Sequence, residues 1–464
     1  MQSAGQSLRA SSERAAPEAP ELSDAPSVSP HTEALPPPDD GAGPTDFANQ
    51  DVGPEAPSER VSVPTVTVEQ IEAARETIRD AALVTPMEGS RWLDALTGTS
   101  VHLKCENLQR TGSFKIRGAY TRISNLTDEE RSRGVVAASA GNHAQGVALA
   151  AATLGIRSTV FMPHGAPIPK ETATRAYGAE VRFTGHTIDD ALIEARAFST
   201  ETGAVLIHPF DHPDIIAGQG TCGLEILEQA PDVATILVPT GGGGLIAGIA
   251  TAVKAKRPDV TVIGVQAEAA AAYPESLRSG HPVPLEAMTT MADGIAVGCP
   301  GDVPFAAIQR NVDDIRTVSE ESLSTAVLAL MERAKVVVEP AGAAAVAAVL
   351  DNPHDFTGPL VVVLSGGNID PLLMLRVIRH GMAAQGRYLS IRCRILDRPG
   401  GLAGLLAELS AADANLIDVV HERTSATLAL DQVEVVLQLE TRGPEHRTQV
   451  LESLERGGYA PRVN

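Results

Sequence analysis

The sequence predicts an α/β fold built on helix-covered parallel sheets, followed by a smaller α+β domain. Between about residues 65 and 385, short valine-rich runs alternate with alanine-rich segments of helical length, which is typical of parallel sheets covered by helices. Several of these runs end in glycine-rich or polar loops, where open α/β sheets carry their ligand contacts. After residue 387, apolar and polar residues alternate, as in strands that are exposed on one face.

The first 64 residues differ in composition from the rest of the chain. They hold eleven of the 32 prolines and a single aromatic residue, Phe47, and acidic residues outnumber basic ones eleven to three. Such a segment can bury little apolar surface, so we expect residues 1–64 to be a disordered extension. It has neither the apolar core of a secretory signal nor the acid-free composition of a transit peptide. Order is expected to begin near Thr67, which forms a helix-capping pattern with Gln70.

The strands of the parallel sheets are predicted from short apolar runs. β-Branched residues dominate these runs, and helical segments separate them. The predicted strands cover residues 135–138, 158–162, 179–183, 205–207, 235–240, 261–265 and 360–364.

Lys115 is the candidate nucleophile. It lies in the segment 111–119 among small, apolar and hydroxyl side chains, where a charged ammonium is hard to maintain. The chain has six lysines against 31 arginines, so arginine serves where plain positive charge is enough, and arginine cannot form a Schiff base at neutral pH. An isolated lysine would be interpreted as a surface residue after a turn. The motifs that follow favour the chemical role.

A run of four glycines predicts an anion-binding loop. The predicted strand 235–240 is followed by Gly241, Gly242, Gly243, Gly244 and Leu245. Because glycines have no side chains, their backbone N–H groups can approach a phosphate closely. The helix that begins here adds the positive end of its dipole. A tight turn would need only one or two glycines. The spacing matches neither the dinucleotide fingerprint nor the nucleotide loop that ends in Gly-Lys-Ser/Thr.

Two further loops place polar groups at the ends of predicted strands. The run 135–138 is followed by Ser139, Ala140, Gly141, Asn142 and His143. The run 360–364 is followed by Ser365. Both positions are those at which α/β sheets hold ligands. His143 by itself is interpreted as a packed histidine rather than as an acid or base.

Taken together and in this order, the motifs resemble those of the threonine ammonia-lyases (threonine dehydratases). The resemblance covers about residues 65–385 and includes weaker stretches at 208–211, 218–221, 293–295 and 339–342. It implies fold type II of the pyridoxal-phosphate enzymes, shared with serine racemase and the tryptophan synthase β chain: two open parallel-sheet domains within residues 65–386. A small mobile domain would span about residues 111–205, with the cofactor in the cleft.

The resemblance also implies pyridoxal 5′-phosphate as the cofactor, and a role for each loop. Lys115, which follows Phe114, would bond to it covalently as a Schiff base. Asn142 would contact its phenolic oxygen and Ser365 its pyridine nitrogen. Its phosphate would be held by Gly241, Gly242, Gly243, Gly244 and Leu245. The substrate carboxylate would be bound by Ser139, Ala140, Gly141, Asn142 and His143.

The implied reaction is the deamination of L-threonine, and of L-serine, by β-elimination of water. The products would be 2-oxobutanoate or pyruvate, together with ammonia, and Lys115 would remove the Cα proton as general base. A serine hydroxyl at the pyridine nitrogen does not hold the ring protonated. The cofactor is then a weaker electron sink, and prompt loss of the β-substituent is favoured.

The alternatives are a serine racemase or β-replacement enzyme of the same fold, and a catalytically dead amino-acid-binding regulator. Ala140 occupies the position at which the racemase relatives carry a second serine, so the hydroxyl that could exchange a proton on the opposite face is missing. Gln266 falls where those relatives have a carboxylate metal ligand, and only Glu268 nearby is a hard ligand. We therefore predict no dedicated metal site. The intact Lys115 motif and glycine loop disfavour a dead enzyme.

Residues 387–464 predict a separate α+β domain. Strands are expected at 388–396, 416–423 and 432–439, and helices at 402–410 and 445–455. This βαββαβ order resembles the ACT domain, whose Asp-Arg-Pro-Gly-x-Leu turn commonly lines an amino-acid effector site. The matching residues are Asp397, Arg398, Pro399, Gly400 and Leu402. The resemblance implies isoleucine or valine as effector, and the alternative is a domain used only for oligomerisation.

Composition disfavours several function classes. A formal net charge of −21 makes nucleic acid an unfavourable partner, and no run approaches the roughly 18 apolar residues of a membrane span. The cysteines are scattered and form no metal or redox pair. We expect a cytoplasmic enzyme that assembles as a homo-oligomer, a dimer or a tetramer.

Overall fold

The computed structural model describes residues 63–423 and 428–464, and the strands within these ranges form three sheets. The extension predicted for residues 1–64 therefore lies almost wholly outside the described residues. Helix α1 (Val68–Thr77) begins at the predicted capping box, in which the backbone N–H of Thr67 donates to Oε1 of Gln70 at 3.0 Å. None of the described helices is long and apolar enough to cross a membrane.

The first sheet has the strand order β1-β2-β10-β7-β8-β9. The bounds are Met87–Gly89 (β1), Val101–Lys104 (β2), Leu360–Val363 (β10), Thr235–Pro239 (β7), Thr261–Ala267 (β8) and Asp314–Val318 (β9). Strand β1 is antiparallel to β2, and all other neighbours in this sheet are parallel. The predicted strands 235–240, 261–265 and 360–364 thus form its centre, with ends that differ by one or two residues.

Helices cover both faces of this sheet. They are α2 (Arg91–Thr97), α8 (Pro213–Gln229), α9 (Gly244–Lys256), α10 (Tyr273–Ser279), α11 (Asp302–Asn311), α12 (Glu320–Ala329), α13 (Pro340–Asp351) and α14 (Pro371–Ala384). Because side chains alternate along a strand, Val361 and Val363 pack in one core with α8, α9 and α11, whereas Leu360 and Val362 pack in another with α12 and α13. Because both faces of these strands are buried, their sequences are apolar throughout and do not alternate with polar residues.

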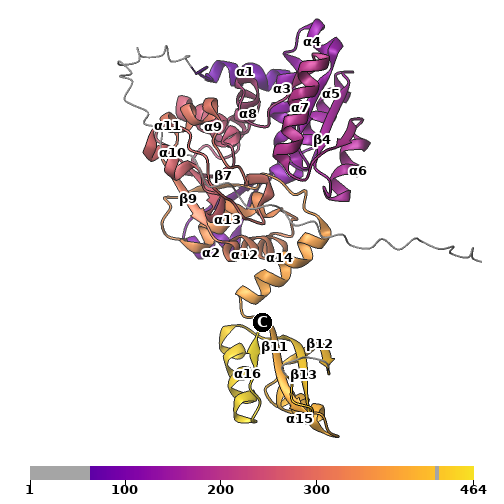
Figure 1. The fold of residues 1–464 in the computed structure, drawn as a ribbon. Helices are drawn as coiled ribbons and strands as arrows, with labels where there is room; N and C mark the ends of the chain where they lie inside the picture. Colours follow the sequence, from indigo (N-terminus) through magenta and orange to yellow (C-terminus); the bar gives the residue numbers. More distant parts are fainter. Residues whose placement is uncertain (1–62, 424–427) are drawn as a thin grey trace, which may run out of the picture. The chain divides into compact units, whose positions relative to one another are not determined.

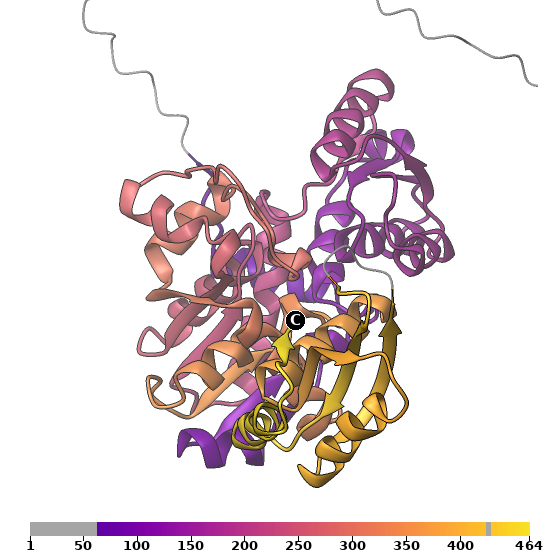
Figure 2. The ribbon, with the colours of Figure 1, turned by 60° about the horizontal axis from the view of Figure 1, so that its bottom comes forward.

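The second sheet is entirely parallel, in the order β5-β4-β3-β6. Its strands are Val135–Ala138 (β3), Ser158–Met162 (β4), Glu180–Phe183 (β5) and Val205–Leu206 (β6). The accompanying helices, drawn in indigo to magenta in Figures 1 and 2, are α3 (Lys115–Ser124), α4 (Asp128–Arg133), α5 (Asn142–Thr153), α6 (Ile168–Ala176) and α7 (Ile188–Thr202). All four predicted strands are present. The domain limits 111–205 stay a prediction.

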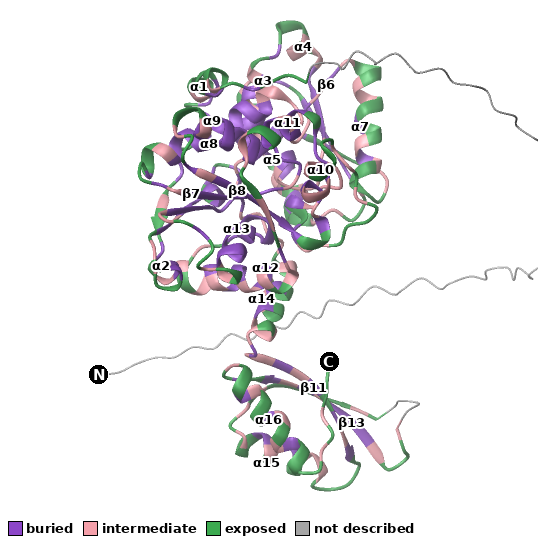
Figure 3. Ribbon diagram, turned by 90° about the vertical axis from the view of Figure 1, so that its left-hand side faces the viewer, coloured by how far each residue is buried: buried purple, intermediate pink, exposed green. Residues whose placement is uncertain are grey.

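The third sheet is antiparallel and lies in the C-terminal residues, in the order β12-β13-β11-β14. Its elements are Tyr388–Leu396 (β11), Gly401–Ala411 (α15), Asn415–Glu422 (β12), Gln432–Glu440 (β13), Pro444–Arg456 (α16) and Arg462–Val463 (β14). Figure 3 shows α15 and α16 on one side of this sheet. Residues of both helices share a core with alternate residues of β11 and β13. The predicted βαββαβ order is confirmed.

Three strands of the first sheet, β1, β2 and β9, were not predicted. Strand β2 contains His102 and Lys104, and the ammonium of Lys104 is buried against the carboxylate of Glu225 at 2.6 Å. Strand β9 contains Asp314 and Arg316 and lies at the sheet edge, where one side is open to solvent. Charged residues break the apolar pattern in β2 and β9. The ammonium on β2 is balanced by a partner that is distant in sequence, whereas Arg316 on β9 pairs with Asp314 of the same strand.

Candidate active site

A cavity of about 780 Å³ lies at the carboxyl ends of parallel strands from the first and second sheets. The loops after β3, β6, β7 and β10 supply parts of its wall. This is the size of a site for a small organic ligand. Every residue predicted to contact cofactor or substrate lines it: Phe114, Lys115, Ser139, Ala140, Gly141, Asn142, His143, Gly241, Gly242, Gly243, Gly244, Leu245 and Ser365. Their individual roles remain predictions.

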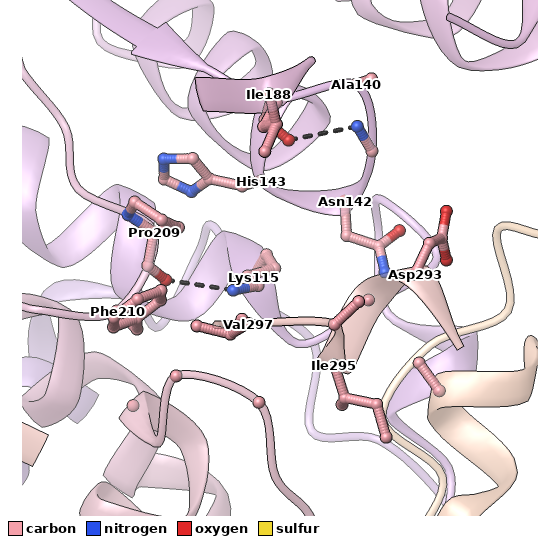
Figure 4. Close-up of a pocket in the computed structure, with 18 of the residues that line it drawn as sticks. Lys115, Ala140, Asn142, His143, Ile188, Pro209, Phe210, Asp293, Ile295 and Val297 are labelled. Atoms are coloured by element: carbon pink, nitrogen blue, oxygen red, sulfur yellow. Dashed lines mark hydrogen bonds between the residues drawn. The ribbon is translucent and has the colours of Figure 1, made fainter. Parts of the chain in front are cut away.

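Lys115 is the first residue of α3 and directs its amine into the cavity (Figure 4). Its Nζ donates to the carbonyl oxygen of Pro209 at 3.1 Å and lies 5.2 Å from the ring centre of Phe114. Burial lowers the pKa of Lys115 to about 8, and the carboxylate of Glu339 opposes this shift only in part. An uncharged, nucleophilic amine is therefore accessible close to neutral pH.

The glycine loop has the features of an anion site. Within the described residues, the backbone N–H groups of residues 241–244 have no hydrogen-bond acceptor. Gly243 has φ +97°, a left-handed conformation that favours glycine, and a Cβ at Gly242 would overlap the ring of Phe210. The loop leads directly into the 13-residue helix α9. Free donors and the helix dipole both favour a bound phosphate.

The loop after β3 presents a second set of donors at the start of α5. The N–H groups of Asn142 and His143 have no acceptor among the described residues. Ser139 folds back so that its Oγ accepts from the N–H of Gly141 at 3.1 Å. In Figure 4, Ala140, Asn142 and His143 project from this one loop. The arrangement suits a carboxylate, which helix N-termini stabilise.

His143 is packed, in agreement with its interpretation from the sequence. Its Nε2 lies 2.8 Å from the carbonyl oxygen of Ile207, and burial, followed by the nearby Lys115, lowers its pKa to about 3. The ring is therefore neutral, and it donates to that carbonyl from Nε2. It is a poor candidate for proton exchange near pH 7.

Glu339, Lys170 and Asp293 are charged residues of the cavity that were given no role from the sequence. Glu339 directly precedes α13, is buried, and accepts a hydrogen bond from Nδ2 of Asn142 at 2.6 Å. Burial and the charge of Asp293 raise the pKa of Glu339 to about 7, although Lys170 and Asn142 oppose the rise. Lys170 on α6 is paired with Asp293 at 2.5 Å. Lysine is rare in this chain, and this rarity was the signal that could have identified Lys170.

A smaller cavity of about 290 Å³ lies in the C-terminal domain. Its lining includes four of the five predicted effector residues, Asp397, Arg398, Pro399 and Leu402, together with Ile395, Leu396, His421 and Arg423. Gly400 adjoins it at the cap of α15, with φ +87°. Arg423 donates to Asp397 at 3.2 Å. The cavity thus offers both charges and an apolar wall.

No cluster of three or more His, Cys, Asp or Glu side chains suited to a metal ion occurs within the described ranges. Gln266 on β8 is fully buried, and its Oε1 accepts from the N–H of Tyr273 at 3.0 Å. The expectation that no metal binds near Gln266 stays a prediction.

Comparison with known proteins decides the family. A model of the pyridoxal-phosphate dependent enzymes matches residues 78–366, which is more than half of the chain. This chain belongs to that family. The L-threonine ammonia-lyase of Thermotoga maritima is 46% identical over 399 residues, 86% of this chain and 99% of that protein. The crystal structure of a threonine deaminase from T.th. has a TM-score of 0.63 at 46% identity and covers 66% of this chain and 99% of its own.

Maize serine racemase is similar at a lower identity. Its structure has a TM-score of 0.65 at 35% identity and covers 68% of this chain and 97% of its own. The fold alone therefore does not separate lyase from racemase.

The residues of the larger cavity fit pyridoxal 5′-phosphate. The glycine loop has unused N–H donors for the phosphate, and Lys115 has an amine of lowered pKa for the carbonyl carbon. Ser365, which follows β10, has a hydroxyl in the same cavity. An anion cradle, an amine and a hydroxyl thus line a single cavity, and they match the phosphate, the carbonyl carbon and the ring nitrogen of the cofactor.

Proposed function

We propose that this pyridoxal-phosphate dependent enzyme is an L-threonine ammonia-lyase that also deaminates L-serine. It eliminates water from the amino acid and yields 2-oxobutanoate from threonine or pyruvate from serine, each with ammonia. The observation that carries the proposal is the amine of Lys115, with its pKa lowered to about 8, in one cavity with an anion-binding loop. The relatives named above support the choice of substrate.

Lys115 moves the proton at the substrate Cα. When bound, the cofactor supplies an electron sink for negative charge on that carbon. The amine of Lys115 acts as general base and must be uncharged to do so, a state that burial favours. The carbonyl oxygen of Pro209 accepts from Nζ at 3.1 Å and so limits the directions in which the amine points.

The loop of Ser139, Ala140, Gly141, Asn142 and His143 binds the substrate carboxylate in this proposal. The unused N–H groups at the start of α5 supply hydrogen bonds, and the helix dipole supplies partial positive charge. Asn142 would also contact the cofactor's phenolic oxygen, and its side chain is held in place by Glu339 at 2.6 Å and by Asn368 at 2.8 Å. The region 111–205 would close over the substrate as a mobile domain and exclude water.

The C-terminal cavity is proposed to bind isoleucine or valine. Asp397 can pair with an amino group, Arg398 or Arg423 with a carboxylate, and Ile395 and Leu402 can contact an aliphatic side chain. This set matches a small apolar amino acid. Regulation of an enzyme that feeds isoleucine synthesis follows if the effector binds two states of the catalytic region with different affinity. Assembly as a dimer or tetramer is part of the same proposal.

The assay that tests the function measures 2-oxo acid and ammonia from L-threonine and L-serine with cofactor-loaded protein. We expect 2-oxobutanoate from threonine and pyruvate from serine. D-Serine is measured in the same reactions, because its release without 2-oxo acid would favour the racemase. Ala140, which has no hydroxyl to exchange a proton, is the observation against that outcome. No product from either amino acid would contradict the proposal.

A further inference from the structure

Tyr273 is a fully buried tyrosine behind the glycine loop. It is the first residue of α10, and its hydroxyl donates to the carbonyl oxygen of Gly242 at 3.1 Å. Its ring stacks against Phe305 with 6.5 Å between centres, and its backbone N–H donates to Gln266. The ring and the backbone of Tyr273 are therefore anchored by Phe305 and Gln266, which do not line the cavity, and this limits where its hydroxyl can lie.

The hydrogen bond from Tyr273 determines which way one peptide of the loop faces. In a planar trans peptide the carbonyl and the following N–H point in opposite directions. Because the oxygen of Gly242 points to Tyr273 in the core, the N–H of Gly243 points away from that core. A Cβ at Gly243 would overlap the tyrosine hydroxyl, so the two groups are packed against each other.

Four successive glycines have unusual conformational freedom, so their peptides need an external restraint. If the peptide between Gly242 and Gly243 flipped, a carbonyl oxygen instead of an N–H would face a bound phosphate and would repel it. Within the described residues, Tyr273 supplies the hydrogen bond that the Gly242 carbonyl receives.

We propose that Tyr273 is a positioning residue for the cofactor phosphate. Its hydroxyl fixes the peptide between Gly242 and Gly243 so that the Gly243 N–H faces the cavity. The inference rests on the proposed use of the glycine loop as the phosphate site. The affinity that the phosphate group contributes would thus depend in part on Tyr273, whose side chain lies outside the cavity.

The test compares pyridoxal 5′-phosphate with pyridoxal, which lacks the phosphate, in binding to the apoprotein of Tyr273→Phe. The substitution keeps the ring and its packing and removes only the hydroxyl. The dissociation constant for pyridoxal 5′-phosphate should rise roughly threefold to tenfold, the effect of one neutral hydrogen bond, and that for pyridoxal should not change. The matched control is Tyr177→Phe, whose exposed hydroxyl donates to the carbonyl of Arg110 at 3.4 Å.

Two other outcomes of this comparison would overturn the proposal. Equal loss of affinity for both ligands would assign Tyr273 a general packing role and overturn the proposal, as would no loss for either. Thermal unfolding of the apoprotein shows whether the variant is folded, and Gly243→Ala, which must displace the hydroxyl contact, should lose affinity for the phosphorylated ligand selectively. If the unmodified protein itself bound both ligands equally, the phosphate site would be wrong, and this inference would fall with it.

Discussion

The amine of Lys115 and the carboxylate of Glu339 lie in the same cavity with pKa values moved toward neutrality from opposite sides. Burial is the main cause for both, since it disfavours the charged form of each group. Their mutual attraction opposes both shifts without cancelling them. Groups perturbed in this way are typical of catalytic sites, and the sequence analysis assigned a chemical role only to Lys115.

Replacing Lys115 with alanine should abolish turnover and the covalent link to the cofactor together. Both depend on the same nitrogen atom, so activity should fall by several orders of magnitude and the absorbance of the bound cofactor should change. Lys254→Ala, at a lysine paired on the surface with Asp313, is the control and should keep both properties. An alanine variant that retained either property would refute the assignment.

The pKa of Lys115 also predicts how fast the apoprotein takes up its cofactor. Only the uncharged amine attacks the carbonyl of pyridoxal 5′-phosphate. Below pH 8 the rate of reconstitution should therefore rise about tenfold for each pH unit, and it should level off above about pH 8. Stopped-flow absorbance measures this rate. A plateau that began only above pH 10 would mean that the amine is not desolvated.

Glu339 predicts a pH-dependent effect on stability. Its pKa of about 7 lies above the ordinary value of 4.5, so the folded apoprotein binds more protons than the unfolded chain between these values. The contribution of Glu339 to stability thus falls as the pH rises from 4.5 to 7. Glu339→Gln keeps the acceptor for Asn142 and removes this dependence. Relative to the unmodified apoprotein, it should gain up to about 3 kcal/mol between pH 4.5 and pH 8.

Denaturant unfolding at pH 4.5 and pH 8 measures this difference. Glu171→Gln, at an ion pair within α6, is the control and should show no comparable pH-dependent gain. A gain at pH 4.5 instead of pH 8 would contradict the sign of the shift.

At the scale of elements, helix α3 is anchored by a buried group of four charged side chains. Arg117 pairs with Glu106 at 2.8 Å and with Glu225 on α8 at 2.6 Å, and Glu225 also pairs with Lys104 on β2. Two positive and two negative charges balance within the core, which is the condition under which buried charges are tolerated. The anchor lies about one half-turn of helix from Lys115 and so ties the position of the amine to the first sheet.

Arg117→Met should destabilise the protein by about 3–5 kcal/mol, because it leaves a buried carboxylate without its partner. The midpoint of urea unfolding measures the loss. Arg122→Met is the matched control on the same helix. Its partner Asp214 is 3.4 Å away and partly exposed, so the cost should be no more than about 1 kcal/mol. If the two substitutions lowered the free energy of unfolding equally, the buried ion pairs would be no more important for stability than the partly exposed one.

The strands show where sequence patterns suffice for an element and where they fail. Strands β4 and β10 are buried on both faces, and their apolar runs predict them to within one residue. Strands β2 and β9 contain charged residues, and the ammonium on β2 is balanced by a partner far away in the sequence, Glu225. A local pattern does not include such partners.

At the scale of the whole molecule, the chain joins a catalytic region to a C-terminal domain with its own cavity. Arg398→Ala should remove the proposed effect of isoleucine or valine on activity and leave basal activity unchanged, because Arg398 lies in the C-terminal cavity and not in the catalytic one. Initial rates with threonine, with and without each amino acid, measure the effect. Arg447→Ala, on α16 and outside that cavity, is the control.

Binding of isoleucine to the full chain is measured in parallel by calorimetry. Arg398→Ala should weaken it at least about tenfold, as expected for loss of a charged hydrogen bond. Full binding and full regulation in this variant would show that the cavity is not the effector site.

Local order in the sequence was enough to predict the fold class and the C-terminal βαββαβ pattern, and to single out the glycine loop and Lys115, which line one cavity. Apolar periodicity, glycine runs and a rare lysine are properties of neighbouring residues, and neighbours in sequence remain neighbours in the fold. Only the tertiary structure could decide that Glu339, Lys170 and Asp293 share the cavity with Lys115, and that the hydroxyl of Tyr273 donates to the carbonyl oxygen of Gly242. Burial and charge pairing arise between segments that are far apart in the chain, and no local pattern records which distant segments will meet.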